Sequence, residues 1–472
     1  MKNKRMFKVL SVFSIMVITS FFCVMNAAAD DPPFFKKAIE VQPEKIKLER
    51  NEKLITILQT SDIHHHASGN GPFMDYTPNT TGDDNTLGGY ARLSTLINQI
   101  RKAQSLMKVP VLLVDSGDFF METTYDITGS DPAIANPAAL KFFQQMKYDA
   151  ITLGNHEFDW GPQGLSVLLS GGIRNGFTIP VLATNTVFND DPTITGDDDL
   201  KALGILVGKK VLNLHGIRVG LIGLLDPNAD QNSPMAKPVT FNHQYDFIQS
   251  CVDNLRNNDK VDLVIVLSHG GIKSDGSGDD ADLAANVSGI DIIASGHYHT
   301  QTNDVFVKGP SNTIIFEPGE YGEWLSRIDI IYDKKIGCIT AYDFSLLLVD
   351  DNVPGDCKTQ RIVDKYNDKI NKSLTPLGVQ LDTPVLSTDF PLEMASFQIT
   401  GLGSLCADAD RYVANSAAAY NFATPVDVGL VANGVIRDLY PSDAGVISFA
   451  DVYNCLPFGI SPNQPTLPGS PG

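Results

Sequence analysis

The stretch Ala150–Asp159, with the sequence AITLGNHEFD, shows the pattern that decides the fold. Apolar and β-branched residues, which are typical of a short buried strand, lead directly into a glycine and then into Asn155, His156, Glu157 and Asp159. Polar side chains placed in this way lie at the carboxyl end of a strand, where open α/β sheets hold their functional sites. The stretch therefore predicts an α/β fold with a site built from the loops that follow its strands.

Four further blocks of polar residues repeat this arrangement along the chain. Each follows a run with the composition of a buried strand, and together with the first block they are Gln59–His66, Asp115–Asp118, Gly154–Asp159, Ser268–Gly271 and Gly296–His299. Seven of the nine histidines lie in these blocks. Random scatter would not concentrate histidine in this way, so the blocks predict a site that uses imidazole.

The rest of the chain supports a layered α/β domain. The runs expected to form buried strands are Leu54–Leu58, Val111–Val114, Ala150–Leu153, Pro180–Ala183, Val219–Leu224, Leu263–Leu267 and Ile290–Ala294. Gly89–Arg101 has apolar residues at helical spacing, and short buried strands with helices between them indicate α/β layers. We expect another amphipathic helix over Ile362–Ile370, ended near Pro376, and a second α/β segment from Pro384 onward.

The composition is that of a large globular protein. The 472 residues are 43% hydrophobic and 19% charged, which excludes collagen-like, disordered and disulfide-scaffold chains and suggests two or three domains. Lys and Arg number 36 against 55 Asp and Glu, for a net charge of −19, so binding to nucleic acid or to an anionic membrane is not expected. An acidic protein that handles an anionic substrate needs local positive charge, from metal ions or from a few placed arginines.

The first residues predict an export signal rather than part of the fold. A basic start with Lys2, Lys4 and Arg5 precedes the apolar run Val9–Val24, and Ala27–Ala29 offers a small-residue cleavage site. We expect residues 1–29 to be removed as a signal peptide and the protein to be periplasmic, cell-surface or secreted. No other segment is long and apolar enough to cross a bilayer, so no stable membrane insertion is expected after cleavage.

The residue types in the blocks favour bound metal ions. In Asp62-x-His64, alternate residues leaving a strand can turn a carboxylate and an imidazole toward one point, and this donor pair suits zinc, manganese or iron. Asp118 has two oxygens that can bridge two cations, and the preceding glycine allows a sharp turn. His297 and His299 are spaced so that each can face a different ion. Two such ions, about 3.5–4 Å apart, can hold both the attacking and the leaving oxygen of a phosphoryl displacement.

The five blocks together resemble the calcineurin-like dimetal phosphoesterases, and more closely their exported 5′-nucleotidase branch, which includes UDP-sugar hydrolases and 2′,3′-cyclic phosphodiesterases. The segments that carry the closer resemblance are Gly88–Leu93, Gly154–Gly161, Asn433–Asp438 and Asp451–Gly459, within a likeness that covers residues 52 to 460. The resemblance implies a four-layer α/β/β/α metallophosphoesterase core over residues 52–350, after an N-terminal lead at 30–51. A linker helix at 351–382 and a 5′-nucleotidase C-terminal domain at 383–472 would follow.

The resemblance also assigns residues to the metal site. One ion would be held by Asp62, His64, Asp118 and His299, and the other by Asp118, Asn155, His269 and His297, with Asp118 bridging. His156 would bind no metal and would face the scissile phosphate, steadying the charge on the leaving oxygen. Asp159 would keep the His156 imidazole protonated and oriented, since a neighbouring carboxylate favours the charged form. His65 and His66 are extra residues that we expect at the solvated surface.

The C-terminal segment departs from the family pattern. Asn433, Arg437 and Phe458 match substrate-binding positions of the nucleotidases, which hold the base between two aromatic rings. In the motif that opens this segment, the usual Arg or Glu and the two Asn positions are occupied by Gln398, Ile399, Gly401 and Ser404. The second aromatic ring would lie beyond Gly472. We therefore expect an incomplete substrate domain and weak discrimination between nucleotides and small phosphoesters.

The function that the residues and the resemblance imply is metal-dependent hydrolysis of nucleotide phosphoesters by an exported protein. Water between two divalent ions, zinc or manganese with cobalt as a further candidate, would attack phosphorus and release nucleoside and phosphate. Alternatives within the family are 2′,3′-cyclic-nucleotide phosphodiesterase/3′-nucleotidase, nucleotide-sugar hydrolase and sulfur-ester hydrolase activity. An inactive binding protein on the same fold would show lost ligands, and none is lost. We expect a monomer or dimer that binds nucleotides or other small phosphoesters but no nucleic-acid duplex.

Overall fold

The computed structural model describes residues 48–457, apart from residues 130–132, 192, 195, 391, 393–394, 396–397, 417–423, 433–434 and 438–444. The predicted export signal, the predicted substrate-binding residues Asn433 and Phe458, and the end of the chain lie outside the described residues. No helix in the described part of the chain combines the length and the apolar character needed to cross a bilayer.

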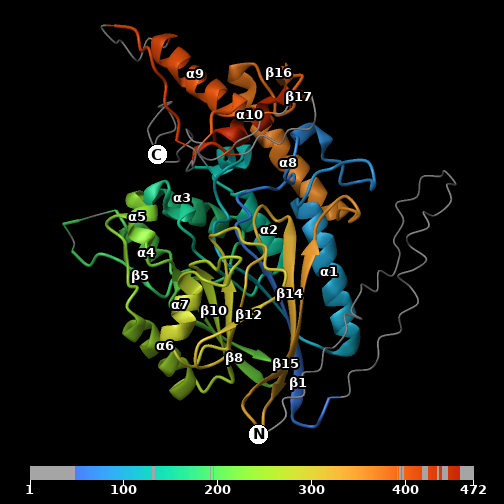
Figure 1. Ribbon diagram of the computed structural model, residues 1–472, viewed down its shortest axis with the longest axis vertical. Coiled ribbons are helices and arrows are strands. Elements are labelled where there is room, and N and C mark those ends of the chain that lie inside the picture. The colour runs from blue at the N-terminus through green and yellow to red at the C-terminus, as the bar shows by residue number, and fades with distance from the viewer. Residues whose placement is uncertain are drawn as a thin grey trace, which may run out of the picture.

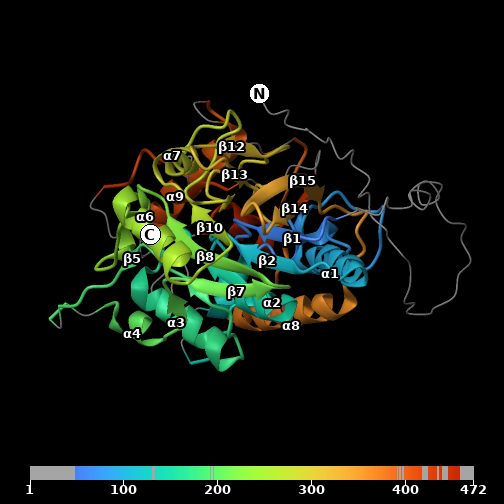
Figure 2. The same ribbon diagram turned by 90° about the horizontal axis from the view of Figure 1, so that it is seen from below.

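Two stacked β-sheets form the centre of the molecule (Figures 1 and 2). The seven-stranded sheet has the order β15-β14-β1-β2-β3-β4-β6, with strands β1 (Glu52–Thr60), β2 (Val111–Asp115), β3 (Ala150–Thr152), β4 (Val181–Leu182), β6 (Leu206–Val207), β14 (Trp324–Asp333) and β15 (Cys338–Leu348). The six-stranded sheet has the order β12-β13-β11-β10-β8-β7, with strands β7 (Lys210–Leu214), β8 (Ile217–Leu225), β10 (Leu263–His269), β11 (Ile292–Ser295), β12 (Phe306–Lys308) and β13 (Thr313–Phe316). Strands β1 to β4 run parallel to one another, so their carboxyl ends lie at one edge of the seven-stranded sheet. Strands β8, β10 and β11 are also parallel, so their carboxyl ends lie at one edge of the six-stranded sheet.

Helices cover the outer face of each sheet, which makes four layers. Helices α1 (Tyr90–Met107), α2 (Ala138–Met146), α3 (Gly161–Arg174) and α8 (Cys357–Leu374) pack on the seven-stranded sheet, and α6 (Tyr245–Asn257) and α7 (Asp279–Asn286) pack on the other sheet (Figure 2). The two faces of a strand therefore bury different clusters. Ile55 and Ile57 of β1 lie between the sheets, whereas Leu58 lies under the helices. Burial on both faces explains the continuous apolar runs in the sequence, and the predicted α/β/β/α fold is confirmed.

The sequence predicted the central strands and helices closely. All seven runs predicted as strands lie in β-strands, with ends displaced by at most two residues. The predicted helices correspond to α1 and α8, and α8 begins at an N-cap where the Asp356 carboxylate accepts a 2.8 Å hydrogen bond from the Thr359 amide. The sequence analysis missed the hairpin β14–β15, which pairs antiparallel with β1. Its outer strand β15 is half-exposed at the sheet edge, and Thr340, Asp343 and Ser345 interrupt its apolar residues before Leu346.

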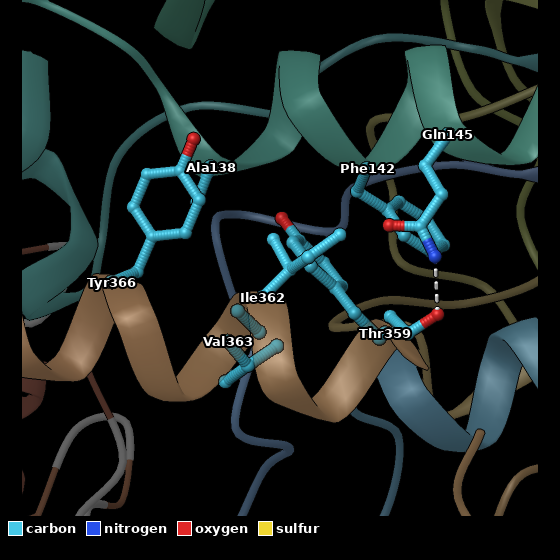
Figure 3. Close-up of a pocket in the computed structure, with 9 residues that line it drawn as sticks. Ala138, Phe142, Gln145, Thr359, Ile362, Val363 and Tyr366 are labelled. Carbon is cyan, nitrogen blue, oxygen red and sulfur yellow. Dashed lines mark hydrogen bonds between the residues drawn. The ribbon is translucent and has the colours of Figure 1, made fainter. Parts of the chain in front are cut away.

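Helix α8 packs against α1 and α2 and leads into a small C-terminal unit. At the contact with α2, Gln145 Nε2 donates a 2.6 Å hydrogen bond to Thr359 Oγ1 (Figure 3). Ile362 and Tyr366 of α8 line a small cavity there together with Phe142. The described part of this unit contains β16 (Pro384–Thr388), α9 (Gly401–Ser416), β17 (Gly445–Ser448) and α10 (Phe449–Cys455). Strands β16 and β17 pair antiparallel, and this unit has an apolar cluster of its own.

A buried ion-pair network joins the segment before α1 to the turn after β15. Arg92 is fully buried, and its Nη2 lies 2.6 Å from Asp84 Oδ2 and 2.9 Å from Asp351 Oδ1. Arg92 Nη1 also donates to the carbonyl and hydroxyl oxygens of Thr86, both at 3.0 Å. The guanidinium is therefore the nearest counter-charge to both carboxylates, although it offsets only one of their two negative charges.

Replacing Arg92 with methionine should leave Asp84 and Asp351 buried without a counter-charge. We expect Arg92→Met to lower the free energy of unfolding by about 3–5 kcal/mol, measured by urea titration. Arg411→Met is the matched control, because Arg411 forms an exposed pair with Asp408 at 3.4 Å and its loss should change the free energy by about 1 kcal/mol or less. Equal losses in the two variants would contradict a stabilising role for the buried network.

Candidate active site

The predicted site residues lie where the carboxyl edges of the two sheets meet. They follow or end strands β1, β2, β3, β10 and β11, in the order Asp62, His64, Asp118, Asn155, His156, His269, His297 and His299. Two hydrogen bonds join the sheets at this edge. Gln59 Nε2 donates to the Ser295 carbonyl at 2.6 Å, and Ser116 Oγ donates to the Ala294 carbonyl at 2.8 Å. The parallel strands and these bonds bring residues from distant parts of the chain into one site.

The aspartate and histidine residues predicted as ligands form two adjacent groups. In each group one donor atom per residue lies within 4.8 Å of the others, and the groups are Asp62, His64 and His299, and Asp118, His269 and His297. Asp118 lies between the groups, since its Oδ2 is 2.9 Å from His269 Nε2 and 3.9 Å from His64 Nε2. His299 Nε2 is 3.4 Å from Asp62 Oδ1. The structure thus groups these six residues in the way that the resemblance implies.

The donors and their surroundings suit divalent transition-metal ions. His64 Nε2 and Asn155 Oδ1 are buried with no hydrogen-bond partner among the described residues, and a buried polar atom without a partner is costly. Burial lowers the pKa of His64 well below its usual value and lowers the pKa of His297 to about 4. Both imidazoles are therefore neutral and able to coordinate a metal. Zinc, manganese and iron all accept carboxylate oxygens, amide oxygens and imidazole nitrogens as ligands.

The backbone of the site is held in an uncommon conformation. Five of the predicted ligands have positive φ angles between 39° and 86°, namely Asp62, His64, Asp118, His297 and His299. Residues other than glycine rarely adopt such angles, and each instance costs on the order of 1–3 kcal/mol. The fold therefore holds these side chains in place at the expense of local stability, which is typical of a functional site.

Glu157 holds the Asp118 turn against the loop that follows β3. Its carboxylate accepts hydrogen bonds from the backbone amides of Asp118 and Phe119, both at 2.9 Å, and of Gly154 at 2.6 Å. Gly154 has to be glycine, because a Cβ atom there would lie 2.2 Å from Asp118 Oδ1. The sequence analysis quoted Glu157 but assigned it no role, although its place among strand-end polar residues was an available signal.

Two of the grouped imidazoles are oriented through their second ring nitrogen. The Ser116 carbonyl lies 2.8 Å from His269 Nδ1, and the Glu320 carboxylate contacts His299 Nδ1. Partners of this kind fix the ring orientation of a metal-binding histidine and direct Nε2 toward the site. Glu320 was missed because it lies in the loop between β13 and β14, where no local pattern marks it.

His156 lies beside the two groups and belongs to neither. Its Nδ1 is 2.7 Å from Asp159 Oδ2, and its backbone amide donates to Asp118 Oδ1 at 2.9 Å. Burial lowers the pKa of His156, but Asp159 and Asp118 outweigh burial and raise this pKa to about 10. The ring is therefore protonated at neutral pH, with its centroid 5.3 Å from that of His64.

Arg437, a predicted substrate-binding residue, reaches the same site from the C-terminal segment. Its Nη2 lies 3.4 Å from His156 Nε2 and 2.6 Å from Glu122 Oε1. The same Glu122 oxygen lies 3.4 Å from His64 Nδ1. The sequence analysis did not identify Glu122, which follows the Asp118 block and has no partner within its own stretch of sequence.

His65 and His66 are buried, which corrects the prediction that they lie at the solvated surface. Their exposed fractions are 1% and 7%. His65 Nδ1 lies 2.5 Å from Asp126 Oδ1, and the His66 ring packs on Tyr321 with the ring centroids 4.1 Å apart. The prediction was wrong because Asp126 and Tyr321 come from two other loops, which the run of three histidines could not reveal.

The comparisons with known proteins agree with this arrangement. A family model described as Calcineurin-like phosphoesterase matches residues 55–301, just over half of the chain. The chain is 27% identical over 430 residues to the Trifunctional nucleotide phosphoesterase protein YfkN of Bacillus subtilis, an overlap that covers 86% of this chain and 26% of that protein. It is 26% identical over 443 residues to the 5′-nucleotidase of Mus musculus, covering 88% of this chain and 70% of that protein.

A solved structure shows the same architecture. The 5′-nucleotidase precursor from Thermus thermophilus superposes with a TM-score of 0.66 at 24% identity, over 86% of this chain and 74% of that chain. The chain spans only about a quarter of the length of the Bacillus relative. The segment matched by the family model contains all five polar blocks and both ligand groups. The chain therefore belongs to the calcineurin-like phosphoesterase family.

Proposed function

We propose that the protein is an exported, metal-dependent hydrolase of nucleotide phosphoesters of the 5′-nucleotidase type. The observation that carries the proposal is the pair of adjacent ligand groups with the protonated His156 beside them. The names of the relatives, a nucleotide phosphoesterase and a 5′-nucleotidase, support a nucleotide as the substrate. A panel of AMP, a 2′,3′-cyclic nucleotide, a nucleotide sugar and a small aryl phosphate would separate this activity from the alternatives within the family.

Two divalent ions complete the site in this proposal. Asp118, Asp62, His64 and His299 would hold one ion, and Asp118, Asn155, His269 and His297 would hold the other. Bound zinc or manganese would supply the positive charge that the acidic chain lacks and would make water an effective nucleophile at neutral pH. Glu157 supports this site by keeping the Asp118 turn in place through the backbone amides of Asp118, Phe119, Phe120 and Gly154.

His156 and Asp159 assist the departure of the leaving group. The Asp159 carboxylate holds the proton on His156 Nδ1 and stabilises the imidazolium. His156 Nε2 then remains available to donate a proton or a hydrogen bond to the oxygen of the leaving nucleoside. The products are a nucleoside and phosphate.

The C-terminal segment contributes to substrate binding. Arg437 comes from the proposed second domain at residues 383–472, yet its guanidinium lies beside His156 of the proposed catalytic domain at residues 52–350. Together with Asn433 and Phe458, Arg437 would bind the nucleoside part of the substrate. This division places the chemistry in the first domain and recognition of the leaving group in the second.

Removal of metal should abolish activity. We expect exhaustive chelation to stop the release of phosphate from AMP, and addition of manganese, cobalt or zinc to restore it, because a bound divalent ion is what would make water an effective nucleophile at neutral pH. Phosphate release and bound metal would be measured on the same samples. Full turnover by protein shown to be metal-free would contradict the proposal.

Two alanine variants should separate the ligands from the proton donor. Asp118→Ala should lose bound metal, because it removes the shared carboxylate. His156→Ala should retain metal while kcat falls by roughly 10²–10⁴-fold, the effect of losing a group that transfers a proton or stabilises charge. Metal analysis and steady-state kinetics would be carried out on both proteins. A metal-depleted His156→Ala variant would reverse the assignment of His156.

The pH dependence of kcat should respond to Asp159. Because Asp159 raises the pKa of His156, the Asp159→Asn change should lower that pKa, and His156 should lose its proton at a lower pH. The alkaline limb of the kcat–pH profile should move down by roughly one unit or more. Asp149→Asn serves as the control, since its carboxylate binds the Leu113 amide at 2.9 Å and takes no part in the site. Superimposable alkaline limbs in wild type and Asp159→Asn would contradict this role.

A further inference from the structure

An ion pair in the candidate site joins the buried Glu122 to Arg437, whose side chain is partly exposed. Arg437 Nη2 is 2.6 Å from Glu122 Oε1, and Glu122 is only 1% exposed. The pair joins the loop after β2 to the C-terminal segment, which supplies Arg437. On its other side the same carboxylate oxygen lies 3.4 Å from His64 Nδ1. Glu122 therefore sits between a metal-ligand candidate and a substrate-binding candidate.

The loop that carries Glu122 is held in a strained conformation. Met121 and Glu122 have φ angles of +71° and +87°, a region that side chains rarely tolerate. Two hydrogen bonds hold the loop there, from the Met121 amide to Asp126 Oδ1 at 3.1 Å and from Thr123 Oγ1 to the His65 carbonyl at 3.1 Å. Such strain persists only where neighbouring residues impose it, so the position of the Glu122 carboxylate is determined by the surrounding structure.

The position of Arg437 beside His156 determines which part of the substrate its charge would contact. Arg437 Nη2 lies 3.4 Å from His156 Nε2, the nitrogen that faces the leaving oxygen in the proposed function. The part of the leaving group that is bonded to this oxygen would therefore lie close to the Arg437 guanidinium. An unpaired arginine there would attract a second anionic group on the substrate. Paired with Glu122, the arginine presents no net charge and can still donate hydrogen bonds.

We propose that Glu122 is a specificity-determining residue, which cancels the charge of Arg437 and so favours phosphoesters with an uncharged leaving group over those with an anionic one. The inference rests on the proposed function and narrows it. Hydrolysis of AMP releases uncharged adenosine, whereas hydrolysis of ADP at its terminal phosphate releases anionic AMP, and a nucleotide sugar releases a sugar phosphate. The wild-type site should therefore prefer nucleoside monophosphates.

The test compares AMP with ADP in wild type and in Glu122→Gln, with metal saturating and bound metal measured. The amide keeps the shape of the side chain and removes its charge, so Arg437 becomes a free cation. The ratio of kcat/KM for AMP over ADP should fall by roughly tenfold or more, through a lower KM for ADP. Calorimetry should show, in parallel, that Glu122→Gln binds pyrophosphate more tightly relative to phosphate than wild type does.

Two further variants make the result specific to this pair. Asp291→Asn is the matched control, because it also removes the negative charge that pairs with an arginine. Asp291 Oδ2 lies 2.5 Å from Arg256 Nη2. This pair lies at the amino end of β11, whereas His297 follows the carboxyl end. This control should leave the ratio unchanged. Adding Arg437→Met to Glu122→Gln should cancel the gain for ADP, because no free guanidinium remains. If Glu122→Gln folds poorly, Glu122→Gly provides the same test with a residue that accepts the positive φ.

The outcomes are distinct. An unchanged ratio in Glu122→Gln with full metal content overturns the inference while leaving the proposed function intact. A loss of metal without a change in the ratio also overturns it, because it assigns Glu122 to the support of His64 alone. If wild type hydrolyses a small aryl phosphate but neither AMP nor ADP, the proposed nucleotide substrate is wrong, and the inference about the leaving group fails with it.

Discussion

The buried carboxylate of Asp118 is the point on which the rest of the site depends. It lies between two imidazoles and accepts a hydrogen bond from the His156 amide, so both groups of candidate ligands and His156 are positioned relative to it. Its loop can approach the loop after β3 only because both carry glycine. A Cβ atom on Gly117 would lie 2.6 Å from the Gly154 amide nitrogen, and one on Gly154 would collide with the Asp118 carboxylate itself. The parallel pairing of β2 with β3 then brings the two loops together.

The free-energy cost of the strained backbone at the candidate ligands has to be offset by stabilising interactions elsewhere in the fold. Five left-handed residues at about 1–3 kcal/mol each amount to roughly 5–15 kcal/mol, which is as large as the net stability of a typical domain. The offset is available in the cluster between the sheets, where side chains such as Ile57, Leu112 and Leu267 are fully buried. Burying one such side chain contributes about 1.5–3 kcal/mol. Burial of the apolar strands therefore stabilises the fold enough to keep the residues that follow these strands in their strained left-handed conformation.

Local patterns in the sequence predicted the parts of the structure that are themselves local. Buried strands are continuous apolar runs, and the polar residues that follow them share one sheet edge, so the central strands and the grouped ligands were both predictable. Glu122, Glu320 and the burial of His65 depend on loops that meet only in three dimensions. The hairpin β14–β15 was missed for a related reason, because polar residues interrupt most of the half-exposed edge strand β15. The sequence pattern therefore predicts where strands end, but it does not predict which loops contact one another.

The candidate site is built from two separate segments of the chain, and contacts between them set the position of Arg437 beside His156. Arg437 is fixed to α10 through its backbone amide, which donates to the Cys455 carbonyl at 2.8 Å. Helix α10 is in turn attached to the core, because the Phe73 amide donates to Asp451 Oδ1 at 2.8 Å. The side chain of Arg437 makes a second attachment at Glu122. Any displacement of α10 relative to the sheets would therefore move the guanidinium away from His156. Arg437 is thus positioned at two points, by its backbone bond to α10 and by its side-chain contact with Glu122.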